Sequence, residues 1–350
     1  MDNTAMILDF DTLFPTINTV SATGKIRTCP EDFRVTERND IELSGTGEHL
    51  WLYIEKTGSN TDWVAKQLSN VCQTPRRQIA YAGMKDRQAI TQQWFSIQLP
   101  KVADVEKIAA ALPDNINILK AGLHSKKIKI GQLEGNQFKL IIRDIIGNKE
   151  EIEQNINHII KLGVPNYFGP QRFGQQMGNI DKAKRWFMGD YKVKSRTLKS
   201  LLISSARSHI FNCIVAQRIK DNIWDQTIAG DLLQLQGSRS WFPGADAKPQ
   251  ELIQRLNEFD IHISAAMWGE DAVQSDGACA ALENAIALNF PEYHKGFKQF
   301  RLKQDRRAIR IQATQLEYHW LNDNSLQLTF ELQPGAYATG VLREIVNFKE

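Results

Sequence analysis

The segment 76–97, RRQIAYAGMKDRQAITQQWFSI, holds the residues best suited to chemistry. In it Asp86 stands between Lys85 and Arg87, on a short connection between two strand-like stretches, and Gly83 permits a tight backbone just before them. A carboxylate flanked by cations stays ionised, because neighbouring positive charge favours its charged form. Such a group can act as a nucleophile. Spacing alone, however, favours a solvated turn, in which these residue types are common.

Three further segments combine aromatic and polar side chains. In TCPEDFRVTE, Phe33 offers a ring on which a base could stack, although this segment alone favours an ordinary core residue on a strand. In LEGNQFKLIIRD, Asn136 can donate and accept hydrogen bonds and so read a base edge, and the alternative is a Gly-Asn hairpin turn. In QPGAYATGVLREIV, Tyr337 follows a Pro-Gly turn, and the alternative is a chain terminus docked on a sheet. None of the three decides a function alone.

Charge is unevenly distributed. The loop-like stretch GVPNYFGPQRFGQQMGN, which includes Arg172, interleaves aromatic and polar groups, a mixture that suits RNA. Residues 182–199 follow it with a net charge of +6, and residues 295–310 also sum to +6, although the whole chain carries only +3. A basic stripe on a nearly neutral protein indicates a localised polyanion site. Two solvated helix faces remain the alternative.

Periodicity predicts the elements that position these residues. Strands are expected in 26–56, 93–99, 126–133 and 137–144, a helix over 60–72 capped by Asn60 or Thr61, and a helix around 152–159 that stops at Gly163. A long helix capped by Ser195 follows, and strands return after about 308 around the turn NDNS. The β-rich, helix-rich, β-rich order fits three small domains or one β-rich domain with a helical insertion. A terminal segment of about 40 residues is too short for its own core, which favours the insertion.

Composition narrows the class of protein. The 350 residues are 42% hydrophobic and 24% charged, which is ordinary for a globular chain. No stretch resembles a membrane span, and the acidic start MDNTAMILDFDTLF lacks the basic region and apolar run of a signal peptide. The four cysteines are far apart without a CxxC pair, which argues against a zinc ribbon or a disulfide framework and indicates a reducing cytoplasm.

Taken together and in this order, the segments resemble the TruD-type tRNA pseudouridine synthases. The resemblance runs from PEDF at 30 to VLRE at 341–344, and its most specific strings are AGMKDRQAITQQW, NYFGPQRFG and SARSHIFN. It implies that Asp86 is the catalytic aspartate, and that Phe33 and Asn136 contact substrate. Tyr337 is the third expected substrate contact; it stands where the family more often has Phe, which keeps an aromatic face for stacking but adds a hydroxyl. Lys85, Arg87 and Arg143 are the candidates for a cation beside Asp86, with Arg172 as a further RNA contact.

The resemblance also implies a fold and a reaction. The expected class is α+β: a mixed-sheet catalytic domain, residues 1–159 and 309–350, interrupted by a helix-rich α/β domain, residues 160–308. The expected reaction isomerises a uridine of tRNA, uridine 13 in the D-arm, to pseudouridine, without cofactor or metal, by a cytoplasmic monomer with no membrane or obligate protein partner. Two other functions stay open: a non-catalytic RNA-binding or RNA-folding module, and a nucleobase glycosidase that releases free uracil.

Overall fold

The computed structural model describes residues 9–39, 41–99, 104–244 and 248–349. The chain forms two compact units. The large-sheet unit consists of Ser21–Lys149, Ala313–Ala338 and Val346–Glu350, and the helical unit consists of Met1–Val20, Glu150–Gln312 and Thr339–Ile345. Each unit is therefore built from segments distant in sequence.

A mixed sheet dominates the large-sheet unit. Its strands run in the order β14-β15-β7-β2-β5-β3-β6, with β4 on β5, and β1 on β7 and β16. The β2–β5 and β1–β16 pairs are parallel and the other pairs are antiparallel. The strands are β1 (Thr23–Lys25), β2 (Phe33–Arg38), β3 (His49–Thr57), β4 (Ile79–Tyr81), β5 (Ile90–Gln98), β6 (Ile116–His124), β7 (Gly135–Ile146), β14 (Thr314–Asn322), β15 (Ser325–Leu332) and β16 (Asn347–Lys349).

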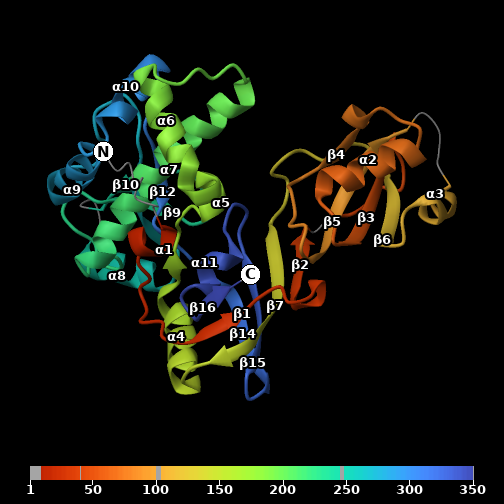
Figure 1. The fold of residues 1–350 in the computed structure, drawn as a ribbon, viewed down its shortest axis with the longest axis horizontal. Coiled ribbons are helices and arrows are strands. Elements are labelled where there is room, and N and C mark those ends of the chain that lie inside the picture. Colours follow the sequence, from red (N-terminus) through yellow and green to blue (C-terminus); the bar gives the residue numbers. More distant parts are fainter. Residues whose placement is uncertain (1–8, 40, 100–103, 245–247, 350) are drawn as a thin grey trace, which may run out of the picture. The chain divides into compact units, whose positions relative to one another are not determined.

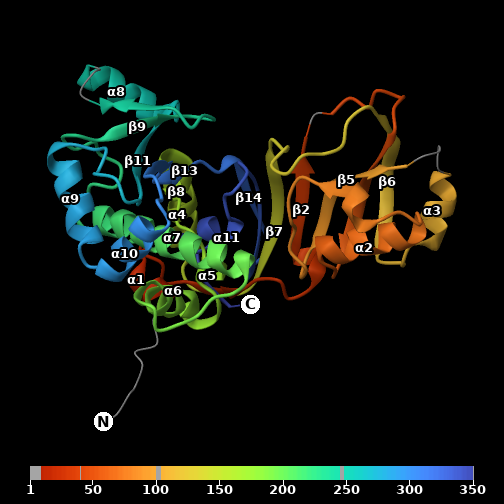
Figure 2. The same cartoon turned by 90° about the horizontal axis from the view of Figure 1, so that it is seen from above.

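Two helices cover one face of this sheet. Helices α2 (Thr61–Val71) and α3 (Val105–Ala111) lie on the same side of β5, β3 and β6 (Figures 1 and 2). Val64 and Leu68 of α2 pack with Leu52 and Phe95 of the sheet, all fully buried. The Asn60 side chain accepts a hydrogen bond from Trp63 N and caps α2, as predicted.

The helical unit is organised around one long helix. Helix α7 (Arg196–Lys220) packs against α6, α9, α10 and β11. The other helices are α1 (Phe10–Leu13), α4 (Lys149–Leu162), α5 (Pro170–Phe173), α6 (Gly178–Met188), α8 (Pro249–Asn257), α9 (Gly277–Ala287), α10 (Pro291–Gln299) and α11 (Ala338–Leu342). One sheet has the strand order β10 (Trp241–Pro243), β9 (Leu232–Leu235), β11 (Ile261–Met267) and β12 (Asp305–Ala308). A second, two-stranded sheet pairs β8 (Val164–Pro165) with β13 (Arg310–Ile311).

The predicted α+β class with a mixed sheet is confirmed, and most predicted elements are present. Gly163 ends α4 with φ +78, and Ser195 caps α7 through Leu198 N. The strand predicted at 126–133 is wrong, because the chain there forms turns in which Ile128 is buried and Ile130 is 93% exposed. The neighbouring strand is instead β6, whose mostly exposed pattern hides it from periodicity. Among the described helices none is long and apolar enough to cross a membrane.

Close packing between α10 and α6 gives a test of the helical unit. A Cβ on Gly296 would lie 2.3 Å from the ring of Phe187, so a side chain there must displace a buried ring. We predict that Gly296→Ala lowers the free energy of unfolding by about 1–3 kcal/mol, the usual cost of overpacking. Thermal unfolding followed by circular dichroism measures it.

Gly178 provides the matched control, since it opens α6 with φ −62 and no atom lies within 4 Å of a Cβ placed there. Gly178→Ala should unfold at or slightly above the wild-type temperature. A Gly296→Ala protein as stable as the wild type would contradict the packing described here.

Candidate functional site

Asp86 lies in the loop between β4 and β5, and its side chain is half-buried. Its side chain is 42% exposed, and its Oδ2 lies 3.1 Å from Nη2 of Arg27. The Arg27 side chain is only 8% exposed, so the cation approaches the carboxylate from the buried side. This geometry leaves one face of the carboxylate open while the other is paired.

Arg27 is held from two directions. Its guanidinium lies over the ring of Phe33, 4.1 Å from the centroid. Its backbone has φ +57, a left-handed conformation that costs a non-glycine residue about 1 kcal/mol or more. Phe33 itself is 1% exposed and meets Phe138 edge-on at 6.4 Å. The Phe33 ring therefore supports Arg27, and its role toward substrate stays a prediction.

The side chain of Lys85 is buried, whereas that of its neighbour Asp86 is partly exposed. Its Nζ lies 3.3 Å from Glu37 Oε2 and donates to Asn136 Oδ1 at 2.7 Å. The side chains of Lys85 and Glu37 are 5% and 0% exposed. Burial lowers the pKa of Lys85 and raises the pKa of Glu37, and the opposite charge of each partner counteracts that effect. The residue before Asp86 is thus tied to β2 and β7 by a buried cluster that includes Asn136.

The other predicted cations occupy different places. Arg143 binds Asp32 with three hydrogen bonds of 2.6–2.9 Å. Arg87 is exposed and forms no ion pair within the described residues. The cation that pairs with Asp86 is accordingly Arg27, which the sequence analysis did not name. It lies 59 residues away in sequence, and its only local signal is a position six residues before Phe33.

Tyr337 and Arg172 are distant in sequence from Asp86 and from the buried cluster of Lys85, Glu37 and Asn136. Tyr337 is 36% exposed and follows a turn in which Gly335 has φ +83, just beyond the end of β15, where Leu332 pairs with Asn136. Arg172 belongs to the helical unit, where it donates to Ser204 Oγ at 2.9 Å and stacks on Phe168. Asn136 lies in β7, which rules out the hairpin-turn alternative for it.

The two basic runs differ in exposure. In 182–199, Lys182, Arg185, Lys192, Lys194 and Arg196 are exposed. In 295–310, Lys295 and Lys298 are exposed on α10, which packs on α6 and so brings cations of both runs onto adjoining helices.

Two cations of the second run, Arg306 and Arg310, are buried, so the alternative of a solvated helix face does not hold for them. Arg306 forms an ion pair of 2.9 Å with Glu283, and both side chains are almost fully buried. Arg310 is buried and donates to the Leu256 carbonyl.

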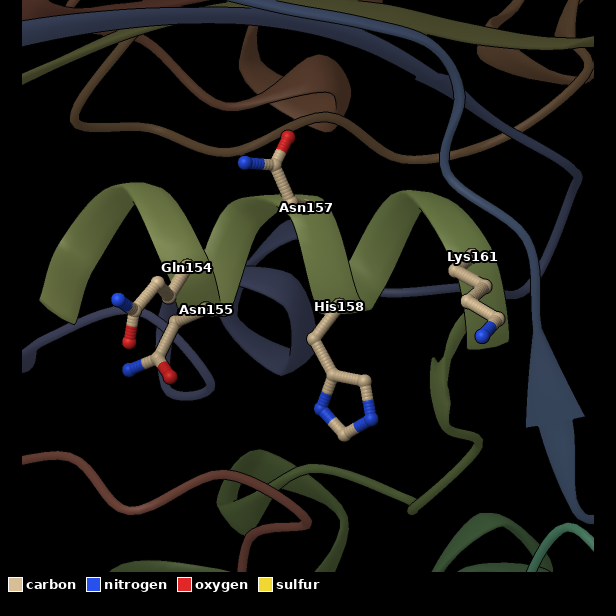
Figure 3. Close-up of a pocket in the computed structure, with 5 residues that line it drawn as sticks. All are labelled: Gln154, Asn155, Asn157, His158 and Lys161. Carbon is tan, nitrogen blue, oxygen red and sulfur yellow. The ribbon is translucent and has the colours of Figure 1, made fainter. Parts of the chain in front are cut away.

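A pocket of about 450 Å³ lies beside α4 (Figure 3). Several of its polar groups bind the N-terminal segment: Asn155 Nδ2 donates to Thr19 O at 3.0 Å, and His158 Nδ1 meets Asn18 Oδ1. It contains none of the predicted site residues. The lining residues are Gln154, Asn155, Asn157, His158 and Lys161. Within the described part of the chain no three His, Cys, Asp or Glu side chains gather as a metal site would require.

Comparison with known proteins identifies the family. The family model for tRNA pseudouridine synthase D (TruD) matches residues 13–183 and 183–345. The chain belongs to the TruD family.

Individual TruD proteins agree with this assignment over nearly the whole chain. The tRNA pseudouridine synthase D of Hydrogenovibrio crunogenus is 40% identical over 327 residues, 93% of this chain and 94% of that protein. The tRNA pseudouridine synthase D of Pseudomonas syringae pv. syringae is 39% identical, covering 92% and 91%. The crystal structure of the putative TruD from Methanosarcina mazei, 19% identical, superposes with a TM-score of 0.77 over 97% of this chain and 98% of that one. The last comparison shows that the fold is shared.

The ion pair between Asp32 and Arg143 lies next to Phe33, and its contribution to the stability of the fold can be tested. Burial by itself raises the pKa of Asp32, but the hydrogen bonds and charge of Arg143 outweigh it and hold that pKa below its ordinary value. A carboxyl with a lowered pKa stabilises the fold above its ordinary pKa, and that stabilisation is lost as pH falls. We predict that Arg143→Met lowers the free energy of unfolding by about 3 kcal/mol at neutral pH, because Asp32 would remain buried and unpaired.

Urea denaturation and hydrogen exchange of β2 and β7 amides measure this loss, which should shrink as pH falls and Asp32 protonates. Lys25→Met is the control: it removes the Lys25–Asp144 pair, whose side chains are 60% and 57% exposed, and should change stability little. Equal effects of the two variants would contradict a structural role for Arg143.

Proposed function

We propose that Asp86 is the catalytic carboxylate with which this chain converts a uridine of tRNA, uridine 13 in the D-arm, to pseudouridine. Membership of the TruD family makes the chain a tRNA pseudouridine synthase, an isomerase. The observation that carries the proposal for Asp86 is its geometry: a half-exposed carboxylate paired from the buried side with Arg27, in the segment that most resembles the family's catalytic motif.

The isomerisation breaks the N1–C1′ glycosidic bond, turns the uracil and forms a C5–C1′ bond, while C5 loses a proton and N1 gains one. The carboxylate serves either as a nucleophile toward the sugar or as the base that takes a sugar proton. Both roles need it charged and aimed. Arg27 forms an ion pair with the carboxylate and restricts its orientation.

The target base must leave its stack, which costs a few kcal/mol, and stacking on an aromatic ring returns about 1–3 kcal/mol. Tyr337 is suited to this because its ring is partly exposed, whereas Phe33 is covered. Asn136 Oδ1 accepts from Lys85, and since an ammonium only donates, the Asn136 amide directs its Nδ2 group elsewhere. We propose that this Nδ2 group donates a hydrogen bond to a carbonyl oxygen of the uracil.

We assign catalysis to the large-sheet unit and much of the tRNA contact to the helical unit, where residues 160–308 were predicted to form an inserted RNA-binding domain. Exposed cations on α6, on the 189–199 segment and on α10 support phosphate contacts. Arg172 beside Phe168 supports a further RNA contact. We further propose that the protein acts as a monomer, and that it acts in the cytoplasm, a reducing compartment consistent with its scattered free cysteines.

A charge-removing variant of Asp86 tests the catalytic assignment. Asp86→Asn keeps the size of the side chain but removes its charge, so we expect pseudouridine formation to fall by at least about 10³-fold. Affinity for tRNA should stay within about twofold, because the carboxylate is not a phosphate contact. Incubation of a tRNA transcript with purified protein, followed by chemical mapping of pseudouridine, measures both the rate and the position.

Each outcome of that assay separates one alternative. Near-normal turnover by Asp86→Asn would refute the catalytic assignment and favour an RNA-binding role for this site. Release of free uracil by the wild type would indicate a glycosidase. Pseudouridine at another position would refute uridine 13 as the target.

A triple variant tests the role of the basic run 182–199. Replacing Lys192, Lys194 and Arg196 with Ala removes three exposed cations. We expect weaker tRNA binding, most at low salt, and a plot of log affinity against log salt that is shallower by about 2–3. Lys120→Ala and Lys139→Ala, which remove exposed cations of the large-sheet unit, are the controls. An unchanged salt slope in the triple variant would exclude this segment from the RNA footprint.

A further inference from the structure

Lys56, near the end of β3, is a fully buried lysine. Its ammonium donates to two backbone carbonyls, that of Ser59 and that of Asp86, the latter at 2.8 Å. Within the described residues no carboxylate forms an ion pair with it. A buried ammonium with two neutral acceptors is costly, and an apolar side chain of similar volume would cost the fold less. Stability alone therefore does not account for a lysine here.

Three side chains, those of Gln93, Thr61 and Lys56, form hydrogen bonds to the backbone of the loop that carries Asp86. Gln93 Nε2 donates to Gly83 O at 3.0 Å, and Lys85 N donates to Thr61 Oγ1 at 2.9 Å. Thr61 Oγ1 in turn donates to Gln93 Oε1 at 2.8 Å, which joins these two supports. Lys56 is the third side chain, and of the three it alone holds the peptide of Asp86 itself and carries a charge.

The electrostatics agree with this geometry. Burial lowers the pKa of Lys56 to about 8, a shift that Asp86 opposes and Lys85 reinforces. Its neighbours across the sheet, Thr91 on β5 and Ile116 on β6, do not titrate. The charged groups that act on Lys56 are thus Asp86 and Lys85, while Glu37 faces Lys85.

We propose that Lys56 is a positioning residue for the isomerisation: its ammonium fixes the peptide carbonyl of Asp86 and so keeps the carboxylate, which pairs with Arg27, aimed at the sugar. The inference rests on the proposed role of Asp86. Lys56 is sealed beneath the loop and touches neither substrate nor the reacting atoms, so it acts only through Asp86.

The test compares Lys56→Met and Lys56→Arg with the wild type in single-turnover pseudouridine formation at saturating protein. For Lys56→Met we expect the rate constant to fall about 10²-fold, the loss that a displacement of about 1 Å causes, with tRNA affinity unchanged within about twofold. Lys56→Arg, which keeps the charge, should recover most of that rate. Ile108→Ala is the matched control, because it removes apolar packing from the same unit without a polar contact to the loop.

A second readout needs no variant. The wild-type rate constant should fall as pH rises through about 8, because Lys56 then loses its charge. Lys56→Arg should keep its rate across that range, since a guanidinium stays charged. This profile decides the question if circular dichroism shows that Lys56→Met does not fold.

Asp86→Asn is measured alongside, so that the two ideas fail separately. Turnover by Asp86→Asn would refute the proposed function. If Asp86→Asn is inactive while Lys56→Met matches the wild type, or while Ile108→Ala slows the reaction as much as Lys56→Met, the positioning role alone is overturned. A wild-type rate that is flat between pH 7 and 9, or a limb equally present in Lys56→Arg, overturns it as well.

Discussion

The reaction needs a carboxylate that is both held in one orientation and reachable from solvent, and the pairing of Asp86 with Arg27 satisfies both conditions. The Asp86 side chain is 42% exposed, but its cation is 8% exposed and lies on the protein side. An ion pair this open adds about 1 kcal/mol or less to stability. Its value lies in orientation, since a guanidinium fixed over the Phe33 ring restricts where the carboxylate can turn.

The surrounding structure serves to keep that pair in place. Arg27 adopts a left-handed backbone, and three side chains hold the peptides of the Asp86 loop. Beneath the loop, Lys85 and Glu37 are buried as a pair that reaches Asn136. Buried charges cost stability, and their concentration around one loop is typical of a functional site. The mixed sheet supplies this arrangement, because β2, β3, β5 and β7 each contribute one or more of these residues.

Features that depend on neighbouring residues could be predicted from the sequence. The caps at Asn60 and Ser195 and the Gly163 stop follow from local chemistry, and the period-2 pattern of β7 and β15 follows from burial of one face. The motif around Asp86 and the family resemblance could also be predicted, because long sequence motifs rarely match a family by accident. The family comparison confirms that resemblance.

Features that depend on distant residues could not be predicted. Arg27 reaches Asp86 across 59 residues, and Arg143, an apparent candidate for the same place, is taken by Asp32 across 111. The two basic runs have the same net charge in the sequence, but in the second run Arg306 is buried in the core and paired with Glu283. The sequence does not show which cations are exposed. The alternation in 126–133 suggested a strand, but a strand also needs a partner edge, and β6 occupies the edge beside β3.

The most direct test of the central claim is the structure of the wild-type protein bound to a tRNA. The account predicts one uridine extruded from its stack, with its ribose C1′ or C2′ about 3–3.5 Å from a carboxylate oxygen of Asp86 while Arg27 still holds the other side. A complex in which every uridine remains stacked, or in which the extruded base lies against a surface remote from Asp86, would contradict it.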